Sequence, residues 1–208
     1  MILIGQYDSP FVRRVGIALT IYGMAFEHRP WSTFADAEQL RPLNPLTRVP
    51  TLVLDDGFVL IESDAILDYL DRLVRPDQAL FPVVEPARHR AMKIAALATG
   101  MADKAVSMFY EKRLHSEVSQ AWLQRCQGQI EGALAALEAD RASLGSCYWG
   151  GDRIGHADIA VVTAIRFIVE AHVGLISMAR YPSLSAHAAN LEALPVFQQI
   201  QQIFIPPA

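Results

Sequence analysis

The sequence predicts an α/β domain followed by an all-helical domain. Residues 1–75 alternate short apolar runs with helical patterns, residues 87–208 show helical apolar spacing throughout, and three prolines cluster between these regions. We therefore assign a first domain to residues 1–75, a linker to residues 76–86 and a helical domain to residues 87–208. The chain has 208 residues, of which 52% are hydrophobic, so it is long enough to bury a sizeable core.

Short strands and helices alternate in the predicted first domain. The Asp56-Gly57 dipeptide is a strong turn signal and divides residues 51–63 into two antiparallel strands. A helix that crosses between the first two strands makes them parallel, so the predicted sheet is mixed. In chain order we expect a strand at 1–6, a helix at 10–22, a strand at 25–30, one or two helical turns at 36–41, the hairpin at 51–63 and a helix at 63–74 that is capped by Ser63.

The second domain is predicted to contain only helices. The segment 157–171 is apolar nearly all round, apart from Arg166 and Glu170, which are spaced to form an ion pair. Such a helix is expected at the centre of a domain, with other helices around it. The remaining helices are predicted at 87–114, 117–140, 183–193 and 196–203.

The composition argues against several classes of function. The formal charge is −4 without a long basic run, so we expect no nucleic-acid partner, because phosphate binding needs clustered Lys and Arg. Two cysteines suggest neither a disulfide framework nor a metal site. No run of 18 apolar residues and no signal peptide is evident, so we expect no membrane span and a cytoplasmic location.

Ser9 is the first candidate for chemistry. It precedes Pro10 at the start of a predicted helix, where Ser is a preferred N-cap and Pro suits the first position. The hydroxyl could therefore only cap the helix, or it could act at the positive end of the helix dipole. The residue type alone leaves both readings open.

Four short motifs in order resemble the cytosolic glutathione transferases, in particular bacterial, serine-type members similar to the tau and zeta classes. They are "DSPFVRRVGIAL" at 8–19, "NPLTRVPTLVLDDG" at 44–57, "LIESDAILDYL" at 60–70 and "HADIAV" at 156–161. The resemblance covers the whole chain and implies a thioredoxin-like first domain with a mixed four-stranded sheet. It also implies glutathione as co-substrate, no metal and a homodimer, with the hairpin and third helix packed on the long helices of the partner.

The resemblance assigns five residues to glutathione binding. Glu62 is expected to pair with the α-amine, while Ser63 and the helix N-terminus hold the γ-glutamyl carboxylate. A cis peptide bond before Pro50 is implied, although trans is the usual state of such bonds. It leaves the backbone of Val49 free to pair with the cysteinyl unit, and Arg48 can meet the glycyl carboxylate.

Within this resemblance Ser9 becomes the catalytic candidate. A cysteine thiol in water has a pKa of about 8.5, and a helix N-terminus with hydroxyl donors lowers such a pKa. Ser9 would donate a hydrogen bond toward the thiolate and would not itself be the nucleophile. Tyr7 is the alternative hydroxyl, since other classes of the family use a Tyr in this region. Position 9 is not Cys, which disfavours thiol-exchange activity.

The resemblance implies an enzyme that conjugates the glutathione thiolate to small apolar electrophiles. Alternatives are glutathione-dependent isomerisation or dehalogenation, and a non-catalytic binding or regulatory protein. Two residues depart from the family pattern, Gly155 in place of a capping Ser or Thr and Thr47 in place of Gly, and neither is expected to touch the chemistry. The acceptor pocket is expected where the first helix faces the helix at 87–114, lined by Phe11, Phe34, Met101, Lys104, Ala105, Met108 and Phe109.

Overall fold

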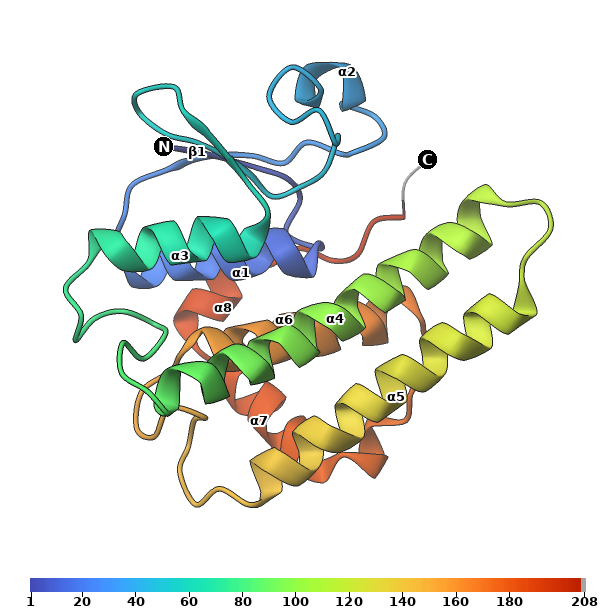
Figure 1. The fold of residues 1–208 in the computed structure, drawn as a ribbon. Helices are drawn as coiled ribbons and strands as arrows, with labels where there is room; N and C mark the ends of the chain where they lie inside the picture. The colour runs from blue at the N-terminus through green and yellow to red at the C-terminus, as the bar shows by residue number, and fades with distance from the viewer. Residues whose placement is uncertain (207–208) are drawn as a thin grey trace.

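A four-stranded sheet lies at one end of the molecule and a set of helices at the other, in a computed structural model that describes residues 1–206 (Figure 1). The strands are β1 (Ile2–Ile4), β2 (Glu27–Arg29), β3 (Thr51–Val53) and β4 (Val59–Ile61), in the spatial order β2-β1-β3-β4. β1 and β2 are parallel, and β3 and β4 form an antiparallel hairpin. Gly57 turns this hairpin with φ of +87°, a value that glycine adopts without strain. The predicted mixed sheet is confirmed.

Three helices accompany the sheet, namely α1 (Pro10–Ile21), the short α2 (Ala37–Leu40) and α3 (Ser63–Leu73). Figure 1 shows α1 and α3 side by side between the sheet and the second set of helices. The prediction that Ser63 caps α3 is wrong. The helix begins at Ser63, the N-cap is Glu62, and the Ser63 hydroxyl accepts a hydrogen bond from Arg14 instead of a helix N–H.

The rest of the chain forms α4 (Ala87–Leu114), α5 (Gln120–Ala142), α6 (His156–Ala171), the 3-10 turn η1 (Met178–Arg180), α7 (Pro182–Glu192) and α8 (Pro195–Gln199). The helical nature of the second domain is confirmed. The last helix is shorter than predicted, since α8 ends at Gln199 and the chain then runs back toward the first domain without regular structure (Figure 1).

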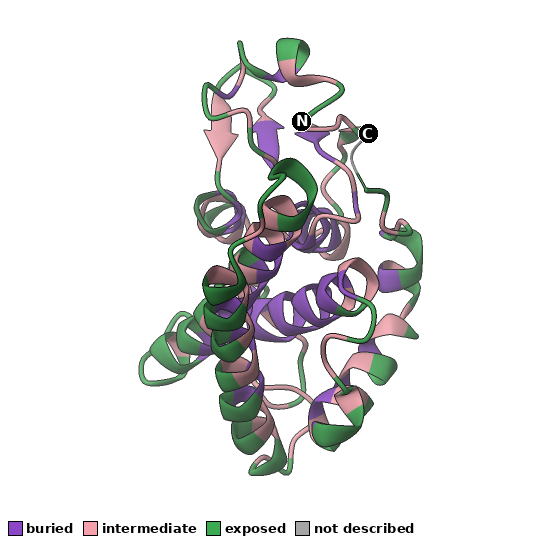
Figure 2. Ribbon diagram, turned by 90° about the vertical axis from the view of Figure 1, so that its right-hand side faces the viewer, coloured by how far each residue is buried: buried purple, intermediate pink, exposed green. Residues whose placement is uncertain are grey.

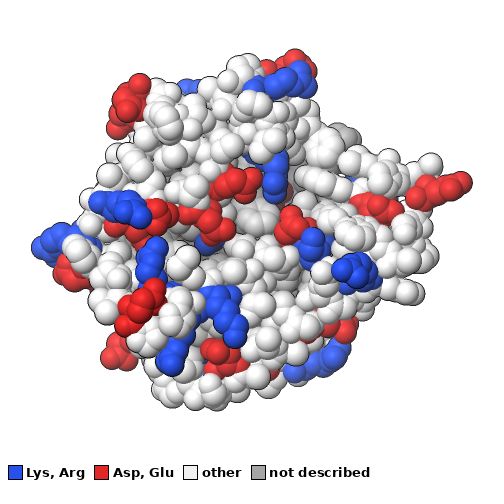
Figure 3. Space-filling view, in the orientation of Figure 1, with Lys and Arg blue, Asp and Glu red and all other residues white. Residues whose placement is uncertain are grey.

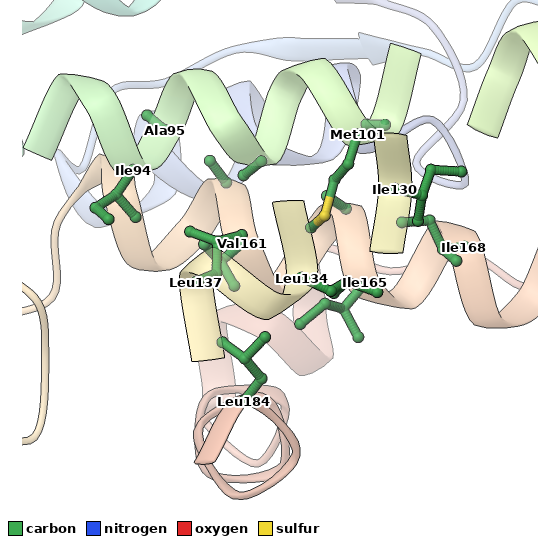
Figure 4. Close-up of a cluster of buried hydrophobic side chains, with 14 of the residues drawn as sticks. Ile94, Ala95, Met101, Ile130, Leu134, Leu137, Val161, Ile165, Ile168 and Leu184 are labelled. Carbon is green, nitrogen blue, oxygen red and sulfur yellow. The ribbon is translucent and has the colours of Figure 1, made fainter. Parts of the chain in front are cut away.

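Helix α6 joins the cores of both domains. It is buried along most of its length, as its apolar sequence predicts (Figure 2). Val161 and Ile165 pack with residues of α4, α5 and α7 in the helical core (Figure 4). Ile159 and Val162 belong instead to the core under the sheet, together with side chains of α1 and α3. The two domains therefore share one central helix.

Gly155 has a packing explanation. Its N–H donates to Asp158 Oδ2 at 2.9 Å, which supplies half of a capping box, and glycine has no side-chain oxygen for the other half. The expected weak box is therefore present. A Cβ at this position would lie 2.8 Å from the carbonyl oxygen of Leu80, which also accepts from the His156 N–H. The close approach of the linker thus favours glycine.

Arg13 of α1 forms hydrogen bonds to the end of α7 and to the chain that follows it. This arginine is buried, and its guanidinium donates two hydrogen bonds to the carboxylate of Glu192, at 2.6 and 2.7 Å. It also donates to the carbonyl oxygens of Phe197 and Ile200. Because these donors all have acceptors, the buried charge is compensated and the position of residues 197–200 is fixed.

Candidate active site

A cavity of about 650 Å³ opens between the two domains, a size typical of small-molecule sites. We call its two sides the first-domain wall and the helical wall. The first-domain wall consists of Gln6, Asp8, Ser9, Pro10, Phe11, Trp31–Phe34 and Leu46–Val49. The helical wall consists of Asp103, Val106, Ser107, Phe109, Tyr110, Glu111, Leu114, His115, Phe167, Phe204 and Ile205. Figure 3 shows acidic and basic side chains interspersed over the face of the molecule that is seen in the orientation of Figure 1.

Ser9 lies in the first-domain wall and also caps α1. Its Oγ accepts from the Val12 N–H at 3.4 Å, which is a long and therefore weak hydrogen bond. An accepting hydroxyl still has its own proton to donate. The two readings that the sequence leaves open are therefore compatible, because one side chain can cap the helix and donate into the cavity.

Tyr7 does not line the cavity. Its ring stacks on His28 with centroids 3.8 Å apart, and it lies so close to α1 that a Cβ on Gly16 would be 2.8 Å from it. Burial raises the pKa of Tyr7 to about 12. This geometry favours Ser9 over Tyr7 as the hydroxyl that faces a ligand.

The buried amide of Asn44 holds the loop that carries Arg48 and Val49. Asn44 Nδ2 donates to the carbonyl oxygen of Arg48 at 2.8 Å and to Thr51 Oγ1 at 3.1 Å. Its Oδ1 accepts from the Leu46 N–H at 3.1 Å, so one side chain ties three points of the loop together.

The peptide bond between Val49 and Pro50 is cis, as the resemblance implies. Within residues 1–206, neither the N–H nor the carbonyl oxygen of Val49 has a hydrogen-bond partner. Thr47 adopts φ of +50° and lines the cavity. Thr47 thus borders the cavity, and the expectation that it does not touch the chemistry stays a prediction.

Glu62 lies on the rim beside the first-domain wall, where its carboxylate pairs with Arg48 at 3.3 Å. Both side chains are about half exposed, so solvent weakens the pair and each remains accessible to a ligand. Glu62 has φ of +66°, an uncommon conformation for a residue other than glycine. Backbone outliers of this kind gather at functional sites. Neither Glu62, Ser63 nor Pro50 lines the cavity itself.

Arg14 lies directly behind the start of α3. It is buried, and its Nη1 donates to Ser63 Oγ at 3.2 Å and to Asp64 Oδ1 at 2.7 Å. Its Nε and Nη2 have no acceptor among residues 1–206. Burial lowers the pKa of this guanidinium, and the attraction of Asp64 opposes that change. The positive end of the helix dipole and a buried cation therefore coincide at Ser63.

The structure places three of the seven expected acceptor residues in the cavity, namely Phe11, Phe34 and Phe109. Met101, Ala105 and Met108 are buried in the helical core, and Figure 4 shows Met101 pointing from α4 into the space between α4, α5 and α6. Lys104 pairs with Asp103 and does not line the cavity.

The opposite face of α4 forms the helical wall. Val106, Tyr110 and Leu114 follow one another at intervals of four residues, Ser107 lies three residues before Tyr110, and all four line the cavity. Ala98, Met101, Ala105 and Met108 lie on the face of α4 that packs in the core. The sequence shows the helical spacing of this more polar face as well as that of the apolar face. The spacing alone does not indicate which of the two faces borders the cavity.

The chain after α8 completes the helical wall, which sequence reasoning did not anticipate. The Phe204 N–H donates to Glu170 Oε2 at 3.1 Å, and the Ile205 N–H donates to Asp8 Oδ2 at 3.0 Å. The ring of Phe204 makes edge contacts with Phe109 and Phe167. No periodic pattern marks this segment, so a pattern-based reading has no signal for it.

Two lining carboxylates have shifted pKa values. Burial raises the pKa of Asp8, although the N–H groups of Ile205 and Ser9 oppose the shift. The Ser119 N–H and the imidazole of His115 lower the pKa of Glu111. Within residues 1–206, no group of three or more His, Cys, Asp or Glu is arranged to hold a metal ion.

Family profiles of the glutathione S-transferase N-terminal and C-terminal domains match residues 3–78 and 120–190. The chain belongs to the glutathione S-transferase family. A maleylacetoacetate isomerase from Pseudomonas aeruginosa is 31% identical to it, over 96% of this chain and 94% of that protein.

Two solved structures of the same family share the fold. A glutathione S-transferase from Methylobacterium radiotolerans in complex with glutathione sulfonate is 30% identical, covers 100% and 99% of the two chains and superposes with a TM-score of 0.86. A Pseudomonas fluorescens family member with bound S-(propanoic acid)-glutathione is also 30% identical, covers 100% of both chains and has a TM-score of 0.78. No helix within residues 1–206 is long and apolar enough to cross a membrane.

Proposed function

We propose that this protein binds glutathione along the first-domain wall and conjugates its thiolate to small apolar electrophiles held by the helical wall. The observation that carries the proposal is the position of Ser9, at the N-terminus of a helix and at the edge of a cavity large enough for a small ligand. The family and its glutathione-bound relatives support the same co-substrate.

Glutathione has a cysteinyl unit between two ends that each carry a carboxylate, and the first-domain side offers a partner for each part. The free N–H and carbonyl of Val49 suit the cysteinyl backbone. Arg48 suits the glycyl carboxylate. At the other end, the first N–H groups of α3 and the cation of Arg14 behind them suit the γ-glutamyl carboxylate, and Glu62 suits the α-amine.

The thiolate then lies over the start of α1. A donated hydrogen bond from Ser9 Oγ and the positive helix end both favour the ionised sulfur. Each pKa unit of lowering corresponds to about 1.4 kcal/mol of thiolate stabilisation. A hydrogen bond to a charged group supplies roughly 1.5–3 kcal/mol, which amounts to one to two units.

The test is a titration of the thiolate absorbance of bound glutathione in wild type and Ser9→Ala. We expect Ser9→Ala to raise the pKa of the bound thiol by about one to two units and to lower turnover at neutral pH, with little change in affinity. Loss of the weak cap should cost at most about 1 kcal/mol of stability. Identical titration curves would show that Ser9 acts only as a cap.

Glutathione-dependent isomerisation is a second candidate, favoured by the similarity to the Pseudomonas aeruginosa isomerase. It needs the same thiolate, so the Ser9 titration does not separate it from conjugation. Assays with an aryl halide and with maleylacetoacetate separate the two reactions when free glutathione is measured, because conjugation consumes glutathione while isomerisation regenerates it.

We also propose that the protein is a homodimer in the cytoplasm. Exposed apolar side chains support an interface, since Phe58 on the β3–β4 hairpin is 61% exposed and Met92 on α4 is 46% exposed. Sedimentation equilibrium should then give twice the chain mass of 23.0 kDa. A single 23.0 kDa species at micromolar concentration would refute the dimer.

A further inference from the structure

The positive and negative side chains that line the cavity are not equally available to glutathione and to the second substrate. Arg48 is the one Lys or Arg among the lining residues of the described chain, 1–206. It lies beside Glu62 and is assigned above to the glycyl carboxylate of glutathione. No lining Lys or Arg therefore remains for the second substrate.

The carboxylates that remain differ in how far they are neutralised. Asp103 pairs with the ammonium of Lys104 at 3.1 Å, so its charge is offset. Asp8 accepts a backbone N–H from Ile205 and has no ion pair within residues 1–206. Burial is the main cause that raises the pKa of Asp8, and the carboxylate of Glu170, which itself pairs with Arg166, adds a smaller contribution.

Glu111 is the third lining carboxylate, and it differs from Asp8 in having the imidazole of His115 beside it. Its side chain is 11% exposed and accepts from the Ser119 N–H at 2.8 Å and from His115 at 2.9 Å. These donors keep Glu111 ionised, because both favour the charged form. The imidazole of His115 offsets this charge only when it is protonated. Glu111 and Asp8 thus place negative charge in opposite walls of one cavity.

A large share of the uncharged lining is aromatic. Trp31, Phe34, Phe109, Tyr110 and Phe204 all border the cavity. Aromatic rings attract other rings and cations, whereas they offer no compensation to a desolvated carboxylate.

We propose that Asp8 and Glu111 make this cavity select neutral or cationic aromatic electrophiles and reject substrates that carry a carboxylate. The inference rests on the proposed glutathione site and defines its second substrate. A like charge at about 6 Å, in a medium of effective dielectric constant 20, weakens binding on the order of a hundredfold. Maleylacetoacetate carries two carboxylates, so it is a poor substrate for this cavity despite the similarity to the isomerase.

The test compares two glutathione conjugates that differ only in charge. S-(propanoic acid)-glutathione, the ligand of the Pseudomonas fluorescens structure, carries a carboxylate beyond the sulfur. Its propanamide analogue is the neutral match, and S-(4-carboxybenzyl)-glutathione with its carboxamide forms a longer aromatic pair. Calorimetry on the wild-type protein should show each acid binding ten- to a hundredfold more weakly than its amide. This difference in affinity between acid and amide, which we call the gap, should shrink at 1 M salt, because salt screens the repulsion.

Two variants and one control identify the residues responsible. Asp8→Asn and Glu111→Gln keep an oxygen that accepts the Ile205 and Ser119 N–H groups, so the local structure is retained while the charge is removed. Each should narrow the gap between acid and amide several-fold, and the double variant should narrow it further. Glu117→Gln removes an exposed carboxylate that does not line the cavity, and it should leave the gap unchanged.

The outcomes separate this inference from the proposed function. Equal affinities for acid and amide in wild type, or a gap that neither variant changes, would overturn the inference while the glutathione site stands. If glutathione and all conjugates fail to bind, the glutathione site and the inference fall together. A charge-dependent gap without turnover would support the inference and refute the transferase activity.

Discussion

The two walls of the cavity are built in different ways. In the first-domain wall, Asn44 holds the loop through partners four and seven residues along the chain. In the helical wall, the residues after α8 are held by partners 187 and 197 residues away, at Arg13 and Asp8. The comparison shows that the loop proposed to bind the cysteinyl and glycyl parts of glutathione depends on local contacts, whereas the segment after α8 depends on tertiary contacts.

The largest effect is expected from Arg13→Met. Removing one partner of a buried charged pair costs about 3–5 kcal/mol, and the carbonyls of Phe197 and Ile200 lose their donor as well. Urea denaturation measures this loss, which should lie near the lower end because Arg166 still contacts Glu192. The variant should also weaken binding of aromatic conjugates more than binding of glutathione. Equal losses of affinity for glutathione and for aromatic conjugates would contradict the proposal that the two walls bind different substrates.

Asn44→Ala is the converse experiment. It leaves the partly buried carbonyl of Arg48 with fewer donors, and we expect a loss of about 1–3 kcal/mol in unfolding free energy. Glutathione affinity should fall, since Val49 and Arg48 lose their fixed position, while the preference among acceptors stays the same. Asn190→Ala, an exposed position on α7, is the matched control. Calorimetry with unchanged glutathione affinity would show that the loop does not depend on Asn44.

Phe204→Ala probes the helical wall alone. Phe204 makes edge contacts with two rings, and such aromatic pairs are worth about 0.5–1.5 kcal/mol each. We expect KM for an aromatic electrophile to rise about three- to tenfold, with glutathione affinity unchanged. Ile203→Ala removes the neighbouring apolar side chain, which is 79% exposed, and should have no effect. Steady-state kinetics in which both variants behave alike would exclude a specific role for Phe204.

The smallest effect is expected from Tyr7→Phe. The hydroxyl has no hydrogen-bond partner within residues 1–206 and does not line the cavity, so its removal should change stability by less than about 0.5 kcal/mol. The thiolate titration should match wild type. A shifted titration in Tyr7→Phe, with Ser9→Ala unshifted, would transfer the proposed role from Ser9 to Tyr7.

Short motifs in the sequence predict several local features of the first domain. A Ser-Pro pair marks the start of α1, and Asp56-Gly57 marks the hairpin, whereas the cis bond before Pro50 followed from the family resemblance because an X-Pro pair alone favours trans. The helix start and the hairpin depend on backbone conformations that few residue types adopt, so neighbouring residues are enough to predict them.

The helical wall was predicted only in part, for physical reasons. The sequence shows that α4 is a helix, but the choice of its buried face depends on how α5 and α6 pack against it. Met101 and Met108 are apolar and were assigned to the pocket, yet apolar character equally suits the core that they fill. The contribution of Phe204 depends on contacts with Glu170 and with two distant rings, which no local pattern records.

The shared helix α6 has a consequence for how the protein is made. Leu3, Ile66 and Leu70 pack in one cluster with Ile159 of α6 and with Ile200, which follows α8. During synthesis the sheet domain leaves the ribosome first, but its core stays incomplete until the chain near Ile200 has been added. At a translation rate of about 5–20 residues per second, the time between synthesis of the first domain and synthesis of Ile200 is roughly ten seconds. The first domain therefore depends on residues translated last, and a nascent chain halted before α6 should expose apolar surface to chaperones.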